Sequence, residues 1–404
     1  MKKNYLNNKF FWGINVFFNI CKIIPKNKKI WIFGAWQGDK YSDNSRYFYE
    51  YLMKKNLDKE LKIIWITCNK DILKKPNIKK SYLANSLKGI WYKLRAGVVF
   101  YTNGMYDFGR IDLSKGAYKV ALWHGMPLKR IYFAGNKYIK YSKWQKILRK
   151  IKNALYSNID RDLTISTSKE MSKNLKECFR IEDDEIIITG QPRNDLLVCE
   201  EKIKIEEILS NVKFKYKKEF EKIITYMPTY RANPTLSNGL KKNIISLVKN
   251  NRLEEESVNK NALLIIKLHY LMELKIDDKN ENIIFLRDKD IECTQKLLKI
   301  TDVLITDYSS VFIDFILQKN KNLIFYGFDS EEYFESDMGL FYKYENIFDE
   351  IIKTEAELVN KIKELLNTDE SNTEKINEFF NKESKNFNSF SEKLYKYLLK
   401  YLKF

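Results

Sequence analysis

The chain has 404 residues, of which 44% are hydrophobic and 14% aromatic, so it is long enough for two domains with real cores. Its net charge of +19 favours an anionic partner: a phosphate-rich substrate, an anionic membrane or nucleic acid. The five cysteines are far apart and odd in number, which excludes a zinc module and a disulfide framework and indicates free thiols in a reducing compartment.

The first 29 residues predict a membrane-contacting segment. They are basic, and residues 10–20 form an aromatic apolar stretch that is too short to span a bilayer. No small-residue cleavage site follows, which argues against a signal peptide. An amphipathic helix lying on an anionic membrane surface fits this pattern, and a helix packed on the protein is the alternative.

The rest of the chain alternates short apolar strands with helical stretches, which predicts an α/β fold with parallel sheets. A charged stretch, Glu200–Glu221, reads as a helix that separates two sets of strands. We therefore predict two Rossmann-like domains facing each other, at residues 30–205 and 206–385, and a C-terminal helix at 386–404, within a helical stretch 379–404, that packs back on the first domain. The strands are expected at 30–33, 63–67, 98–102, 119–124, 163–167, 186–189, 223–227, 263–268, 283–286, 303–306 and 323–326, and an early helix at 46–55.

Polar motifs follow several of these strands, at the sheet edge where ligands of such folds bind. The chain contains only two histidines, so a mechanism that needs imidazole must use His124 or His269. His124 lies next to Gly125 and Pro127 after a strand, where a general base near neutral pH can be held. A core histidine bonded to a backbone carbonyl is the alternative.

The second domain offers an anion site. Thr229 and Arg231 follow its first strand and His269 follows the next. Asp307, Ser309 and Ser310 join strand 303–306 to a helix at 311–317, whose first N–H groups suit a phosphate, although an ordinary helix cap explains them equally well. These groups predict a site for one diphosphate.

Arg193 offers a further cation after a strand of the first domain. Its guanidinium can bind a phosphate or a carboxylate, and the neighbouring Asn194 and Asp195 suit a helix cap equally well. The sequence contains no tight Asp/Glu cluster for a metal, so it implies no firm cofactor and leaves an Mg²⁺ requirement open. Protein cations can supply the positive charge that Mg²⁺ often brings to a phosphate site.

The ordered set of motifs resembles the CDP-glycerol glycerophosphotransferase family, the teichoic-acid primases and polymerases. It comprises residues 31–38 with 42–45, 123–129, 166–170, 190–195, 227–231, 268–270 and 306–314. The resemblance implies a GT-B-like fold and a peripheral, monotopic enzyme on the cytoplasmic face of the cell membrane. It also implies transfer of a polyol phosphate, first of all glycerol phosphate, from a CDP-polyol to a hydroxyl of a lipid-linked or polymeric glycan. CMP would be released, in synthesis of teichoic acid, capsule or another surface polysaccharide.

By motif position the resemblance makes His124 the general base and His269 a second catalytic histidine at the donor phosphate. The donor site it implies includes Arg231, Ser309 and Ser310, to which strand-end position adds Thr229, Asp307 and Arg193. Two alternatives stay open: a nucleotide-sugar glycosyltransferase of the same fold, and a basic protein without enzymatic activity that binds membrane or nucleic acid. No recognised nucleic-acid module is visible, so we expect no nucleic-acid partner.

Overall fold

The computed structural model describes residues 18–135, 142–145, 161–209, 220–250, 253, 255, 260–269, 271–272, 274, 282–291, 293–336, 339–368 and 370–402. The chain divides into two compact units. Unit 1 comprises Met1–Met126, Tyr132–Asp195 and Asn386–Phe404, and unit 2 comprises Pro127–Ile131 and Leu196–Lys385. The division after Asp195 lies ten residues before the boundary expected at 205.

The described part of unit 1 contains a seven-stranded parallel sheet of order β3-β2-β1-β4-β5-β6-β7. Its central strands are continuous apolar runs, as expected for strands buried on both faces. Because the chain order reverses between β1 and β4, the topological switch point lies there. The strands are β1 Asn27–Phe33, β2 Lys62–Thr67, β3 Ser81–Leu83, β4 Ala96–Tyr101, β5 Tyr118–Ala121, β6 Leu163–Ser166 and β7 Ile186–Ile188.

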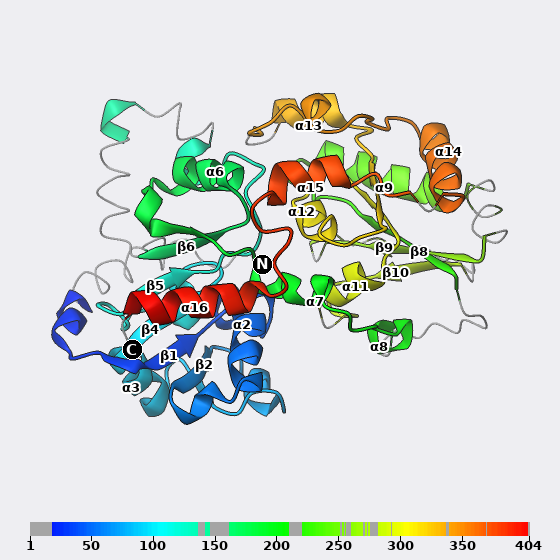
Figure 1. Ribbon diagram of the computed structural model, residues 1–404. Coiled ribbons are helices and arrows are strands. Elements are labelled where there is room, and N and C mark those ends of the chain that lie inside the picture. Colours follow the sequence, from blue (N-terminus) through cyan, green and yellow to red (C-terminus); the bar gives the residue numbers. More distant parts are fainter. Residues whose placement is uncertain are drawn as a thin grey trace. The chain divides into compact units, whose positions relative to one another are not determined.

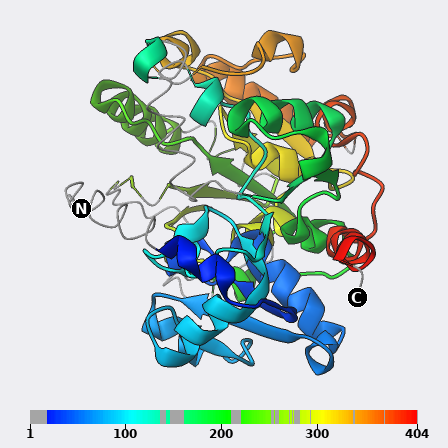
Figure 2. The same ribbon diagram turned by 90° about the vertical axis from the view of Figure 1, so that its left-hand side faces the viewer.

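Helix α16 is the C-terminal element of unit 1, and it packs beside α2 (Figures 1 and 2). Leu394 and Leu398 of α16 are buried in the same core as Trp31 of the sheet. Asp195 holds the start of α16, since its carboxylate accepts hydrogen bonds from the backbone N–H of Phe390 at 2.5 Å and from that of the next residue. The α-helices of this unit are α2 Asp43–Lys54, α3 Leu87–Arg95, α6 Lys169–Phe179 and α16 Phe390–Leu402, and α7 Asp195–Val198 begins at its boundary.

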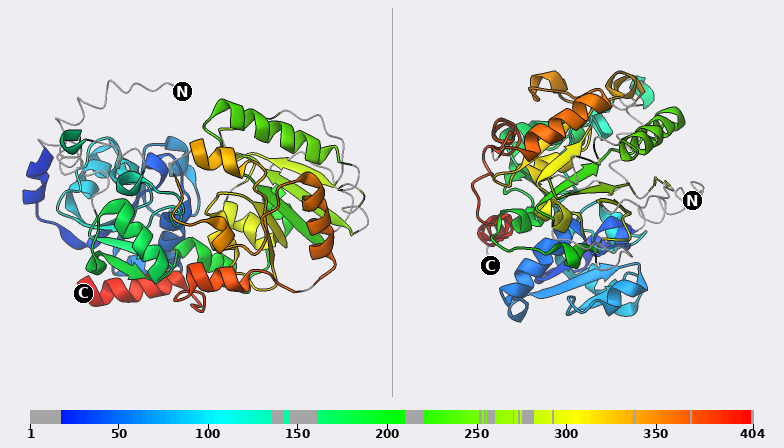
Figure 3. Two further views of the ribbon diagram at one scale, coloured as in Figure 1. Left: turned by 90° about the horizontal axis from the view of Figure 1, so that it is seen from above. Right: turned by 90° about the vertical axis from the view of Figure 1, so that its right-hand side faces the viewer.

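Unit 2 contains, in its described residues, a five-stranded parallel sheet of order β10-β9-β8-β11-β12, with the switch point between β8 and β11. Helices α9 and α14 cover one face of it, and α8 and α11 cover the other (Figures 1 and 3). The strands are β8 Lys222–Met227, β9 Ala262–Lys267, β10 Ile283–Leu286, β11 Val303–Thr306 and β12 Asn322–Phe325. The helices are α8 Ile205–Leu209, α9 Pro234–Val248, α11 Thr294–Ile300, α12 Val311–Phe315, α13 Ser330–Ser336, α14 Glu355–Leu366 and α15 Glu374–Asn381.

Short 3-10 helices occupy several loops of both units. Two of them, η2 and η5, follow strands β1 and β4 and carry residues of the site described below. The set comprises η1 Phe18–Ile23, η2 Trp36–Gly38, η3 Leu57–Lys59, η4 Lys70–Lys74, η5 Met105–Phe108, η6 Tyr132–Ala134, η8 Asp183–Glu185, η9 Pro192–Asn194 and η10 Tyr344–Asn346.

The predicted α/β fold with parallel sheets is confirmed, and each predicted strand is present with ends shifted by at most three residues. The helix expected at 46–55 is α2, which begins at Asp43, and the one expected at 311–317 ends at Phe315. Strand β3 was not predicted, since three residues carry too little periodicity to be recognised.

Two helix predictions were wrong in extent. In the described part of 200–221, only Ile205–Leu209 is helical. The C-terminal stretch forms two helices, α15 and α16, separated at residues 382–389, and the second begins at Phe390. Of the N-terminal segment, residues 1–17 lie outside the described residues. In the part of the chain that is described, no helix is both long and apolar enough to cross a membrane.

Candidate active site

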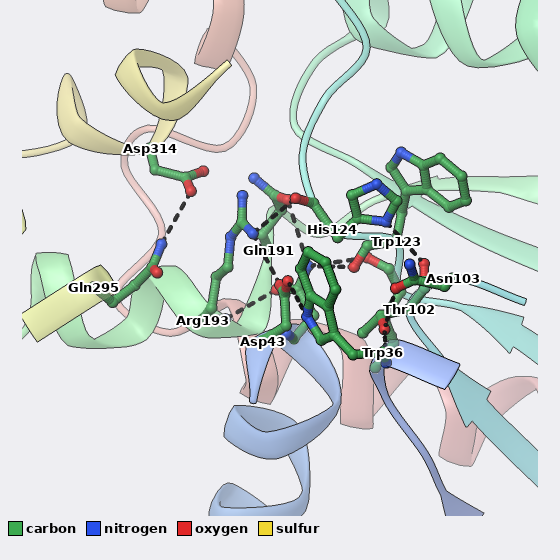
Figure 4. Close-up of polar contacts among 12 residues, drawn as sticks. Trp36, Asp43, Thr102, Asn103, Trp123, His124, Gln191, Arg193, Gln295 and Asp314 are labelled. Carbon is green, nitrogen blue, oxygen red and sulfur yellow. Dashed lines mark hydrogen bonds and ion pairs between the residues drawn. The ribbon is translucent and has the colours of Figure 1, made fainter. Parts of the chain in front are cut away.

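The first group of site residues lies at the carboxyl edge of the sheet of unit 1, at the switch point between β1 and β4 and on the neighbouring strand β5. Trp36 follows β1, Thr102 follows β4, and His124 lies three residues after β5 (Figure 4). This is the place where an open parallel sheet binds its ligand. The sheet topology therefore brings His124 to the carboxyl edge of the sheet, as its position after a strand predicted. A role in ligand binding stays a prediction.

The hydrogen bond of His124 fixes its tautomer. The ring Nδ1 lies 3.2 Å from the backbone carbonyl oxygen of Thr102. A carbonyl oxygen can only accept, so Nδ1 carries the proton and Nε2 keeps its lone pair. The ring is partly buried, with the rings of Trp123 and Trp36 at centroid distances of 4.2 and 5.7 Å. His124 can therefore accept a proton at Nε2.

The electrostatic surroundings keep His124 neutral. Burial lowers its pKa below the ordinary value, and the nearby Arg193 lowers it further. The carboxylate of Asp43 and the hydrogen bond to Thr102 oppose this shift. Since the net direction is downward, the imidazole is unprotonated at neutral pH, the form that a general base requires.

The backbone around His124 is held by two neighbouring segments (Figure 4). The side-chain amide of Asn44 donates to the carbonyl oxygens of Leu122 and Trp123, at 3.0 Å each. Arg193 Nη1 donates to the carbonyl oxygen of His124 at 2.9 Å and to Asp43 Oδ1 at 2.8 Å. The turn needs this support because Trp123 has φ +54°, a conformation that costs a bulky residue energy.

Arg193 therefore acts, in this structure, on the backbone that carries the base. Its side chain is only 10% exposed. The prediction that it binds the donor stays a prediction. The suggested cap of the next helix is not what the structure shows at Asp195: its carboxylate accepts the backbone N–H groups at the start of α16 instead.

The second group of site residues lies at the switch point of unit 2, where β8 and β11 end. Arg231 is fully buried there between two carboxylates. Its Nε and Nη2 donate to Asp329 at 2.8 and 2.9 Å, Nη2 donates to Asp307 at 2.8 Å, and Nη1 donates to the carbonyl oxygen of Thr229 at 2.7 Å. The ring of Tyr308 lies 4.9 Å from the guanidinium carbon. Burial opposes the charge of Arg231, but Asp307 and Asp329 raise its pKa overall.

Arg231 and Asp307 thus appear in this structure as the frame of the site. Asp307 also accepts the backbone N–H of Thr229 at 2.8 Å, so one carboxylate joins the turn after β8 to the turn after β11. The side chains of Arg231 and Asp307 are both 0% exposed. Their predicted direct contact with the donor stays a prediction, and the observed contacts give them a positioning role.

Three hydroxyl groups lie beside this frame. Ser310 is the N-cap residue of α12, yet its side chain makes no capping hydrogen bond. Ser309 Oγ accepts a weak bond from the N–H of Val311 at 3.3 Å, and the buried Thr229 Oγ1 has no hydrogen-bond partner among the described residues. Hydroxyls that no protein group fully satisfies suit a ligand rich in acceptor oxygens.

His269 follows β9 and has the opposite tautomer to His124. Its Nδ1 accepts the backbone N–H of Leu271 at 3.3 Å, so the neutral ring carries its proton on Nε2. The ring is stacked on Tyr230 at a centroid distance of 5.2 Å. His269 can therefore donate a hydrogen bond to a phosphate oxygen, whereas His124 can accept a proton.

Two acidic residues of these sites were missed from the sequence. Asp329 follows β12, and its position after a strand was a usable signal. Asp107, described below, is a lone acid in a loop and gave none. Among the described residues, no group of three or more His, Cys, Asp or Glu side chains is placed to hold a metal ion. Asp314 bonds to Gln295 at 3.0 Å, which ties α12 to α11 (Figure 4).

Comparison with known families decides the class of the protein. The family described as CDP-Glycerol:Poly(glycerophosphate) glycerophosphotransferase matches residues 16–400. The chain belongs to this family. It is therefore a transferase, and the resemblance that its motifs suggested is confirmed.

Similar proteins of known sequence and structure agree with this assignment. The chain is 29% identical over 364 residues to a teichoic acid poly(glycerol phosphate) polymerase of Bacillus spizizenii, covering 86% of each chain. It is 25% identical over 370 residues to a teichoic acid glycerol-phosphate transferase of Staphylococcus aureus, covering 90% of each. The solved structure of the wall teichoic acid polymerase TagF has the same fold, with a TM-score of 0.74 and 21% identity over 100% of this chain and 99% of that one.

Proposed function

We propose that the protein transfers glycerol phosphate from CDP-glycerol to a hydroxyl group of a lipid-linked or polymeric glycan, in the synthesis of a teichoic-acid-like polymer. The family and the relatives support the donor and the class of acceptor. A structure of TagF soaked with CDPG, similar to this chain in fold, fits the same donor. The acceptor hydroxyl attacks the β-phosphorus, a new P–O bond forms, the bond from the β-phosphorus to the bridging oxygen breaks, and CMP leaves.

The single observation that carries this mechanism is the hydrogen bond between His124 Nδ1 and Thr102. It leaves the Nε2 lone pair to take the proton of the acceptor hydroxyl as the P–O bond forms. The aromatic rings around His124 exclude water from part of the imidazole and keep it neutral. We propose that His124 is the general base.

Unit 2 would bind the donor. In this proposal the phosphates face four protein groups, the Nε2–H of His269 and the hydroxyls of Thr229, Ser309 and Ser310. The buried ion pairs of Arg231 hold the turns that carry these hydroxyls. Negative charge grows on the departing CMP oxygen. Pre-aligned hydrogen-bond donors of the protein therefore stabilise the transition state more than the ground state. The donor held by unit 2 would react beside His124, in a GT-B-like arrangement of the two units around one cleft.

Membrane attachment belongs to the same proposal. A lipid-linked acceptor at the cytoplasmic membrane face would be reached most easily by a surface-bound enzyme. The described end of the N-terminal segment, η1, exposes Ile20 by 60% and Ile23 by 78%, and Lys22 and Lys28 are exposed nearby. Apolar and basic groups together suit an anionic bilayer surface. Vesicles with anionic lipid should bind the protein, neutral vesicles should bind it less, and an Ile20→Ser/Ile23→Ser variant should bind weakly to both.

The two histidines provide the test of the roles. His124→Gln should abolish CMP release while the Kd for CDP-glycerol stays within about threefold, because the base contacts the acceptor hydroxyl. His269→Ala should weaken CDP-glycerol binding by about tenfold, the cost of one hydrogen bond to a charged group. CDP-ribitol and UDP-glucose are tested alongside. UDP release from the sugar nucleotide, with no CMP from either CDP-polyol, would contradict the proposed donor.

A further inference from the structure

A buried carboxylate outside the mechanism lies behind His124. Asp107 belongs to η5 and is 0% exposed. Its Oδ1 accepts the backbone N–H of Gln37 at 2.6 Å. Its Oδ2 accepts the backbone N–H of Thr102 at 2.8 Å and that of Asn103 at 3.0 Å. One side chain therefore joins the loop after β1 to the loop after β4.

Both of these loops touch His124. The carbonyl oxygen of Thr102 accepts the hydrogen bond that fixes the tautomer. The backbone N–H of Trp36 donates to the Thr102 hydroxyl at 3.2 Å, and that hydroxyl lies 3.2 Å from Asp107 Oδ2. The Trp36 ring lies 5.7 Å from the imidazole, centroid to centroid. Asp107 therefore binds residues that either contact His124 or adjoin a residue that does. Figure 4 shows Thr102, Trp36 and His124.

The conformation of these loops needs a strong anchor. Trp36 has φ +49° and Gln37 has φ +57°, the left-handed region that residues with a side chain rarely adopt. Such strain persists where surrounding interactions over-determine the backbone, and it gathers at functional sites. A carboxylate accepts at two oxygens, whereas the amide of asparagine accepts at one and places N–H groups against N–H groups.

We infer that Asp107 is a positioning residue of the transfer reaction, which holds the Thr102 carbonyl and the Trp36 loop so that His124 keeps its lone pair on Nε2. The inference rests on the proposed role of His124 as general base. Asp107 has no direct part in bond making. Its contribution resembles that of a carboxylate that orients a catalytic histidine, except that it acts through the backbone of Thr102.

The test compares Asp107→Asn with Asp112→Asn. Asp112 is a matched control, since it is also a buried acid of unit 1, 4% exposed, that accepts the N–H and the hydroxyl of Ser114 at 3.0 and 2.7 Å. Two readouts are taken on the full chain. The first is kcat and KM for CMP release from CDP-glycerol, and the second is the ¹⁵N spectrum of protein labelled at histidine. The chain has two histidines, so a His124→Gln sample assigns both sets of signals.

Asp107→Asn is expected to lower kcat roughly tenfold or more, with KM for CDP-glycerol nearly unchanged. In the ¹⁵N spectrum of Asp107→Asn, the His124 signals should no longer be those of a ring protonated at Nδ1 alone. The His269 signals should stay as they are in the wild type. Asp112→Asn should change neither readout. A purely structural role for Asp107 would lower the melting temperature and leave kcat and the His124 signals of the folded variant unchanged, and that result overturns the inference.

Two safeguards keep the outcome decisive. If Asp107→Asn does not fold, Thr102→Val removes the hydroxyl between Trp36 and Asp107 with little change of shape, and the same two readouts apply to it. If the wild-type protein releases no CMP, or His124→Gln retains full turnover, the proposed function has failed instead. The tautomer pattern in the spectra still decides whether Asp107 controls the state of the His124 ring.

Discussion

Replacing Arg231 by methionine tests whether this residue is a frame of the donor site or its phosphate ligand. In the structure its side chain is 0% exposed and makes three hydrogen bonds to the carboxylates of Asp307 and Asp329 and one to the Thr229 carbonyl. Methionine fills much of the same volume without charge. It leaves two carboxylates buried next to each other with no cation between them.

The expected loss of stability is large. Removing one partner of a buried ion pair costs about 3–5 kcal/mol, because the remaining charge stays desolvated. For a unit of this size that corresponds to a fall in melting temperature of roughly 6–20 °C. Since Asp307 also anchors the Thr229 turn, CDP-glycerol binding should weaken as a consequence. Adding Asp307→Asn to Arg231→Met should restore part of the stability, since it removes one of the two stranded charges.

The assay is urea and thermal unfolding followed by circular dichroism, with CDP-glycerol titrated at a temperature where each variant is folded. Arg287→Met is the control. Arg287 also pairs with a carboxylate through two nitrogens, at 2.9 and 3.0 Å from Asp290, but its side chain is 62% exposed. The melting temperature of this control should change little. An Arg231→Met protein that unfolds like the wild type but no longer binds CDP-glycerol would refute the reasoning and make Arg231 a direct ligand.

Three further predictions concern other parts of the sites. Burial raises the pKa of Asp107 to about 6, so the rate of CMP release should begin to fall as the pH drops through about 6 and Asp107 takes up a proton. The rate should fall further once His124, whose pKa burial lowers below its ordinary value, is protonated. In Asp107→Asn the first of these two steps should be absent from the pH profile. Gly190→Ala should lower the stability of unit 1 by about 2 kcal/mol or more, because Gly190 has φ +72° and an added Cβ would lie 2.1 Å from the Phe390 ring. An unchanged unfolding midpoint would show that α16 shifts freely. His269→Gln should bind CDP-glycerol better than His269→Asn, because the longer amide can place an N–H near the position of Nε2. If His269→Asn binds better in the same titration, the hydrogen bond to the phosphate comes from Nδ1.

Much of the fold was predictable because parallel strands buried on both faces leave continuous apolar runs in the sequence. The site edges followed from the same pattern: His124, Arg231 and Asp307 each come shortly after such a run. What these side chains do there was harder to predict. The sequence suggested a phosphate ligand at Arg231, whereas the structure surrounds it with carboxylates, one of which, Asp329, lies 98 residues away along the chain.

The tautomers of the two histidines could not be read from the sequence either. They depend on which backbone group lies near Nδ1, a carbonyl for His124 and an N–H for His269, and that is set by the loops of the folded chain. The role of Asp107 could not be predicted from the sequence for the same reason. Its importance comes from two loops that meet only when β1 and β4 pair.

The most direct test of the proposed reaction is the initial rate of CMP release from CDP-glycerol, with a bacterial membrane extract as acceptor, for the wild-type protein and for His124→Gln. We predict release by the wild type, none above background from the variant, and CDP-glycerol binding by both. Equal release by the two proteins would contradict His124 as the base. No release by the wild type with any CDP-polyol, despite release of UDP from UDP-glucose, would contradict the reaction itself.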